Sequence, residues 1–121
     1  MSLEAGAALF NEGRFWEAHE AWEGVWIQDR QGPDAAFWKG LIQIVAGCLH
    51  ARRHNRRGAM NKWRSGLQYL EAYRPHHLGA ELDPLVAAIS QRLFRLEASP
   101  GTWPALGPEP RLRYRLSNPQ E

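Results

Sequence analysis

The stretch Phe10–Trp26, F-N-E-G-R-F-W-E-A-H-E-A-W-E-G-V-W, constrains the fold most, because it holds three of the six tryptophans. On a helical wheel, Phe15, Trp22 and Trp26 share one face, and apolar residues widen that face on both sides. The positions left for solvent are Glu17, Ala21 and Gly24. A helix that is apolar over so much of its circumference needs neighbours on several sides. This pattern predicts the central helix of a helical bundle.

The rest of the chain predicts more helices joined by short turns. Helical spacing and end signals place helices at about 2–11, 14–29, 35–53, 58–73 and 83–97, with Ser2 as the first N-cap. Asn55 and Gly58 are typical of a left-handed helix-to-helix turn, and His76-His77 is interpreted as loop. The predicted fold class is all-α: a compact bundle of about five helices built from antiparallel helix pairs, because short links make neighbours antiparallel.

An extended arm follows the predicted helical domain of residues 1–97. Residues 98–121 are rich in Pro and Gly, which does not favour another helix. From Arg111 to Leu116 the sequence alternates, with arginines on one side and Leu112, Tyr114 and Leu116 on the other. This arm is either a strap packed on the bundle or a docking arm for a second subunit.

Bulk properties indicate a soluble cytoplasmic protein. The chain of 121 residues is 44% hydrophobic and 23% charged, which is ordinary for one globular domain. Its most apolar run, 40–49, is far shorter than the roughly 20 residues that cross a bilayer, and no export signal is visible. Cys48 is the single cysteine and predicts a buried thiol in a reducing compartment.

Charge is distributed unevenly along the chain. Residues 1–50 carry three basic and seven acidic side chains, and the remainder carries twelve basic and six acidic ones. We expect the two halves to face each other and pair. The alternative is nucleic-acid binding at the basic junction, whose composition suits phosphate. The residues of this junction are Arg52, Arg53, Arg56 and Arg57.

His19 is the polar exception in the aromatic face. Glu23 follows it one turn later and Glu20 lies further round the helix. In an antiparallel pair, Gln43 of the next helix comes level with His19, and His50 lies closer to the start of the aromatic helix. The candidate polar cluster comprises Glu17, His19, Glu20, Glu23, Gln43 and His50.

Two interpretations of this cluster stay open. In the structural one, Trp22, Trp38 and Trp63 bury His19, and Glu23 or Gln43 satisfies its ring nitrogens. In the catalytic one, the cluster resembles the H-E-x-x-H zinc motif with Glu23 in place of the second histidine. His19, Glu23 and His50 would then hold a divalent metal for a hydrolase, with Glu20 in the site.

The blocks F-N-x-G-x-F-x-E-A-H-E-x-W-E-x-x-W at 10–26 and F-x-x-G-L-I-Q at 37–43 resemble the domain-of-unknown-function 309 family. The likeness runs from about Leu3 to Tyr73. It implies an all-helical domain and supplies no activity. The signature positions it implies are Glu17, His19, Glu20, Trp22, Glu23 and Gln43. A weaker likeness is to tetratricopeptide-type hairpins, although Gly13 and Gly58 are further apart than the 34 residues of that repeat.

These observations favour a non-enzymatic scaffold or binding module without a cofactor. A protein is the expected partner, a homodimer stays open, and neither a membrane nor a nucleic acid is expected. The alternatives are the metal-dependent hydrolase and nucleic-acid binding described above.

Overall fold

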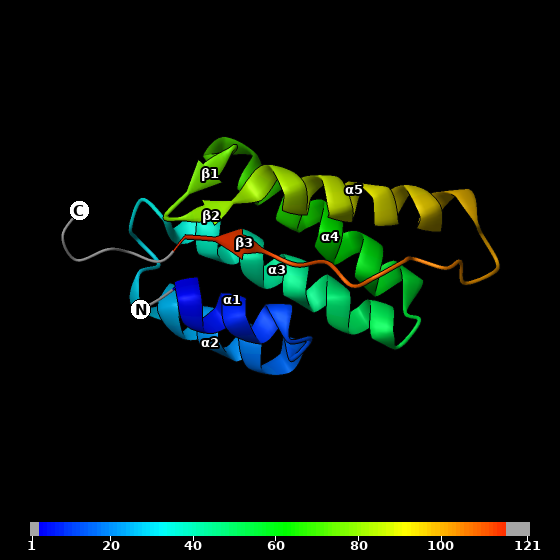
Figure 1. Cartoon of the computed structure of the whole chain (residues 1–121), viewed down its shortest axis with the longest axis horizontal. Helices are drawn as coiled ribbons and strands as arrows, with labels where there is room; N and C mark the ends of the chain where they lie inside the picture. Colours follow the sequence, from blue (N-terminus) through cyan, green and yellow to red (C-terminus); the bar gives the residue numbers. More distant parts are fainter. Residues whose placement is uncertain (1–2, 116–121) are drawn as a thin grey trace.

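The structure, a computed structural model, describes residues 3–115. Its helices are α1 (Leu3–Asn11), α2 (Phe15–Gln28), α3 (Ala35–Arg52), α4 (Arg56–Leu70) and α5 (Leu82–Ala98), with a 3₁₀ turn at Glu71–Tyr73. Consecutive helices run antiparallel along one long axis (Figure 1). The all-α prediction is confirmed. Ser2 and Leu116, which were assigned roles from the sequence, lie outside the described residues.

The central helix is α3, so the prediction that the aromatic helix is central was wrong. Figure 1 shows α3 between the α1–α2 pair on one side and α4 with α5 on the other. Half of its residues are buried, whereas α2 buries Phe15, Ala18 and Trp22 alone among its fourteen. On the uncovered side of α2, Trp16 is 59% exposed and Ile27 is 49% exposed. None of the helices within residues 3–115 combines the length and apolar character that crossing a membrane requires.

The α1–α2 pair and the α3–α4 pair are each held by a tryptophan that packs against a glycine of the facing helix. The indole Nε1 of Trp22 donates to the Leu3 carbonyl over 3.4 Å, and that of Trp63 donates to the Ile44 carbonyl over 3.2 Å. A Cβ atom at Gly6 would lie 2.2 Å from Trp22, and a Cβ at Gly47 would lie 2.3 Å from Trp63. The absence of a side chain at these two glycines is therefore what lets each indole approach the facing helix so closely.

The turn between α3 and α4 differs from the prediction in its detail. Asn55 is the N-cap of α4, and its side chain accepts a hydrogen bond from the Gly58 backbone N–H. The left-handed backbone belongs to His54, with φ of 54°, and Gly58 lies inside the helix. The helix begins earlier than predicted because this cap already satisfies one of its free N–H groups.

A small antiparallel sheet replaces the predicted loop at His76-His77. It contains β1 (His76–His77), β2 (Ala80–Glu81) and β3 (Arg113–Tyr114), in the order β1-β2-β3. His76 faces Glu81, and Glu81 faces Arg113 in the ladder. Leu78 and Gly79 both have positive φ, as the tightest hairpin turns require. The loop interpretation was wrong because two-residue strands show no measurable periodicity.

After α5 the arm turns and runs back along the bundle to β3, which lies beside β2, as Figure 1 shows. Its alternation is real: Leu112 is buried and Tyr114 is half-buried, while the intervening arginines are exposed. Asn11 fixes it by accepting from the Leu112 N–H over 2.7 Å and donating to the Leu112 carbonyl over 2.9 Å. Trp103 stacks on His54 with ring centres 4.5 Å apart.

Replacing Gly6 by alanine tests the tryptophan lock. We expect Gly6→Ala to lower the free energy of unfolding by about 1–3 kcal/mol, because the indole must move to admit the methyl group. Gly24→Ala is the matched control, since nothing lies within 4 Å of a Cβ there. It should raise stability by up to about 1 kcal/mol through helix propensity. Urea unfolding measures both, and equal effects would contradict the lock.

Candidate functional site

A groove between α2 and α3 contains much of the predicted polar cluster. Its main cleft has a volume of about 260 Å³. A second hollow of about 220 Å³ shares His19 and Ala46 with it, so the two lie side by side. We call the pair the α2–α3 groove. The cleft is lined by His19, Glu23, Trp26, Lys39, Ile42, Gln43, Ala46 and Lys62, and the hollow adds Trp16, Leu49, His50 and Arg53.

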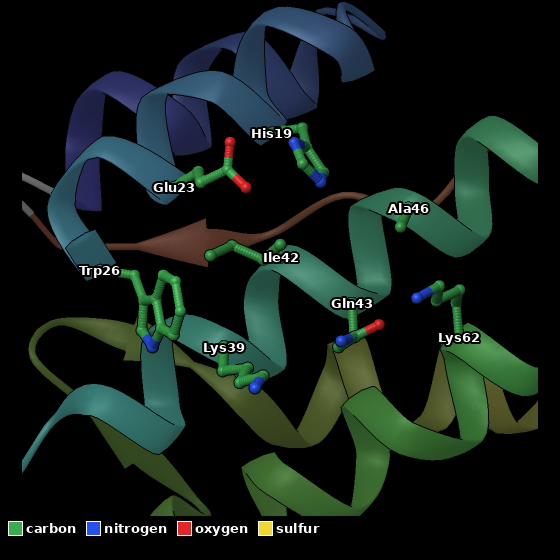
Figure 2. A pocket seen from close by; sticks show the side chains of 8 residues that line it. All are labelled: His19, Glu23, Trp26, Lys39, Ile42, Gln43, Ala46 and Lys62. Atoms are coloured by element: carbon green, nitrogen blue, oxygen red, sulfur yellow. The ribbon is translucent and has the colours of Figure 1, made fainter. Parts of the chain in front are cut away.

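His19 lies at the boundary between the core and this groove. Its ring is stacked parallel to Trp16, with centres 5.9 Å apart, and Trp16 is largely exposed. Figure 2 shows His19 and Glu23 entering the cleft from α2, opposite Gln43 and Lys62. The prediction that Trp22, Trp38 and Trp63 bury His19 was wrong, because those three belong to the core and the cleft reaches the imidazole.

Two buried polar atoms in the groove have no partner. Among residues 3–115, Nδ1 of His19 and Oε1 of Gln43 make no hydrogen bond. The expectation that Glu23 or Gln43 satisfies this histidine nitrogen was therefore wrong. A buried polar atom without a partner costs about 1–3 kcal/mol. Both side chains line the groove, although the two unpartnered atoms themselves are covered by neighbouring atoms.

The other cluster residues are arranged around the groove or outside it. His50 enters the hollow, and its Nδ1 lies 3.1 Å from the Asn55 side-chain nitrogen. Glu20 is exposed and lines neither cleft. Glu17 pairs with Arg14 at 3.2 Å, and a backbone hydrogen bond followed by this arginine lowers the pKa of Glu17. Within residues 3–115 no group of three or more His, Cys, Asp or Glu side chains is placed to hold a metal.

The basic junction is divided between internal and exposed arginines. Arg52 lies over the Phe15 ring and makes a bidentate pair with Glu109 at 2.8 and 2.7 Å. Arg56 donates to the carbonyls of three residues at the end of α5 and the start of the arm: Leu96, Ser99 and Thr102. Arg53 and Arg57 are exposed and make no ion pair within the described part of the chain. Half of the predicted patch therefore holds the arm.

The predicted pairing between the acidic and basic halves was wrong for most of the ion pairs observed. Arg14 pairs within the first half. Arg52, Arg64 and Arg74 pair with carboxylates of the second half. His77 and Asp34, at 2.7 Å, do link the halves. Glu20 and Glu23 have no ion-pair partner among residues 3–115, so these carboxylates stay available on α2.

Sequence reasoning missed several groove residues. Lys39 lies over the Trp26 ring at 5.4 Å, and Lys62 reaches the cleft from α4. The signal for Lys62 is the pair of glycines between α3 and α4: Cβ atoms at Gly40 and Gly66 would lie 2.7 Å from Leu70 and Ile44. Such close helix packing brings a lysine of α4 to a groove formed on the far side of α3.

The fold and the groove define a small protein of antiparallel helical hairpins with an open, partly charged interhelical groove. Residues 3–61 match the model of the family described as Domain of unknown function (DUF309). This match confirms the family resemblance over α1, α2, α3 and the start of α4, a shorter range than the sequence suggests. No curated protein matches the chain.

The Arg52–Glu109 pair generates a pH prediction. Hydrogen bonding to Arg52 lowers the pKa of Glu109 in the folded state. Its stabilisation is therefore present above the unfolded pKa of about 4.3 and is lost as the pH falls through the lower folded value. Because both side chains are about half exposed, the pair is worth little. We expect the free energy of unfolding of the wild type to exceed that of Glu109→Gln by up to about 1 kcal/mol at pH 7.

Urea unfolding at pH 7 and pH 3 checks this, and the difference between the two proteins should be smaller at pH 3 than at pH 7. Glu20→Gln is the control, with no difference at either pH. A Glu109→Gln effect that is the same at both pH values would contradict the assignment.

Arg56 and Arg57 form a matched pair of neighbours with opposite expected outcomes. Arg56→Met removes the donors that bind the end of α5 and the arm, and should cost about 2–3 kcal/mol of unfolding free energy. Arg57→Met should change stability by less than about 0.5 kcal/mol, as exposed substitutions usually do. Urea unfolding measures both. Similar values for the two variants would show that Arg56 does not hold the arm.

Proposed function

We propose that this protein is a non-enzymatic binding module, and that the α2–α3 groove docks a segment of a partner protein carrying acidic and apolar side chains. The observation that carries this proposal is the uncovered side of α2. Trp16 and Ile27 are eleven residues apart, so they lie on one helix face, and both are about half exposed or more. Large aromatic side chains beside a groove are typical of interaction surfaces.

The shape of the groove favours an elongated ligand. Each of its two parts is smaller than the roughly 300–1,000 Å³ of a usual small-molecule pocket. Because the two hollows meet at His19 and Ala46, they would take successive side chains of a peptide that lies along the helices. His19 and Gln43 line the groove, and a small side-chain rotation on binding would let their unpartnered atoms, Nδ1 and Oε1, bond to that peptide.

Charge complementarity favours an acidic ligand. Lys39 on α3, Arg53 directly after α3 and Lys62 on α4 line the groove, against one lining carboxylate, Glu23. These three cations have no carboxylate partner within residues 3–115. An acidic side chain in the ligand would meet them, and Glu23 on the opposite wall would discriminate between orientations of the peptide.

The alternatives have less support from this geometry. A hydrolase metal at His19, Glu23 and His50 would need ligands that converge, and His50 is positioned beside Asn55 instead. Nucleic-acid binding at the junction would rely on Arg52 and Arg56, whose guanidinium groups already bind Glu109 and backbone carbonyls. The cytoplasmic location stays a prediction.

Selection from a random displayed peptide library tests the proposal on the full chain. We expect an enriched consensus that combines Asp or Glu with aromatic or aliphatic residues. Calorimetry with the selected peptide should show at least a tenfold loss of affinity for Trp16→Ala and for Lys62→Glu, as removal of an aromatic anchor or reversal of a charge predicts. Phe94→Ala on α5, which is 68% exposed in wild type, is the control and should bind normally.

Two results would overturn the proposal. One is the absence of a consensus, or a consensus that binds both groove variants normally. The other is concentration-dependent dimerisation abolished by Trp16→Ala in sedimentation experiments, which would identify the occupant as a second copy of the chain. Thermal unfolding of each variant separates lost binding from lost folding.

A further inference from the structure

Arg92 on α5 is the buried charged residue of the core within residues 3–115. It is 8% exposed, and its Nη1 donates to the Ala88 carbonyl one turn earlier over 2.8 Å. The remaining N–H groups of this guanidinium have no partner in the described part of the chain. A buried charge normally requires an opposite charge or a full set of hydrogen bonds.

A small cavity lies beside this guanidinium, beneath the arm. Its volume is about 90 Å³, and its walls come from α2, α3, α4, α5 and residues 106–110. The residues lining it are Phe15, Cys48, Ala51, Arg52, Trp63, Arg92, Leu106, Gly107, Glu109 and Pro110. This volume is large enough to hold water or a small ion.

The charges around the cavity do not balance. Glu109 is the carboxylate among its lining residues, and both of its oxygens already accept from Arg52. Burial raises the pKa of the Cys48 thiol to about 12, so this side chain carries no negative charge at neutral pH. Burial, together with the nearby positive charge of Arg95, lowers the pKa of Arg92. The lining therefore contains two arginines and one carboxylate, and that carboxylate is already bound by Arg52.

We propose that this cavity binds one small inorganic anion, of the size of chloride or phosphate, through the free N–H groups of Arg92. A small inorganic anion fits this volume more readily than a larger organic anion such as gluconate. Because the arm forms the roof through Leu106, Gly107 and Pro110, the bound anion connects α5 to the arm. This site is separate from the α2–α3 groove and does not depend on its proposed function.

Thermal unfolding of the full chain at constant ionic strength tests the site. Sodium gluconate is replaced stepwise by sodium chloride, and in a second series by sodium phosphate. We expect the wild-type Tm to rise saturably by about 4 °C or more with the ion that binds, because a ligand of the native state stabilises it. The two series distinguish chloride from phosphate.

Arg92→Met should abolish the saturable rise, and Arg57→Met should keep it. For a readout that does not require a folded variant, chloride-35 NMR of the wild type should show line broadening that phosphate reverses by competition. Equal Tm values in gluconate, chloride and phosphate would overturn the proposal and leave water as the solvent of Arg92. The same saturable rise in Arg92→Met would place the anion elsewhere and would also overturn it.

Discussion

The contact between an indole and a glycine of the facing helix is the constraint on which the bundle depends. Trp22 on α2 and Trp63 on α4 each reach back to a carbonyl nineteen residues earlier. The two tryptophans are 41 positions apart, and so are Gly6 and Gly47 that face them. A buried indole without an acceptor would leave a costly unpaired donor, so each hydrogen bond fixes the height at which its helices cross.

The groove is a consequence of this lock. With Trp22 turned into the core, the 100° step of a helix places His19 about 60° away and Trp16 about 120° away on the wheel. His19 therefore falls where α2 leaves the core, and Trp16 falls beyond it. The aromatic side of α2 therefore faces the core at Trp22, and at Trp16 it borders the α2–α3 groove. The unpartnered His19 nitrogen follows from that position at the boundary.

The sequence predicts the local structure of this protein better than its spatial relationships. Helix bounds follow to within a few residues from apolar spacing, and the buried side of the arm follows from the alternation at Leu112. Asn55 is an exception, because its role as a cap starts α4 earlier than the spacing predicts. The position of α2 could not be predicted, because a wheel shows which side is apolar and not which side is covered. Gln43 was correctly placed opposite His19, since an antiparallel pair fixes the register. Lys62 was missed because its approach depends on how closely α3 and α4 pack.

The arm decides what the basic half of the chain can do. Arg52 and Arg56 look like a phosphate-binding run in the sequence, yet both hold residues 96–109 through charged hydrogen bonds. The bond from Arg56 to the Leu96 carbonyl also satisfies one of the last carbonyls of α5, which a helix cannot satisfy internally. The unpaired charges that border the groove are Lys39 and Arg53 from α3 and its end, Lys62 from α4, and Glu23 from α2. In the folded protein Arg52 and Arg56 are therefore occupied by internal contacts, whereas unpaired charges of both signs line the α2–α3 groove.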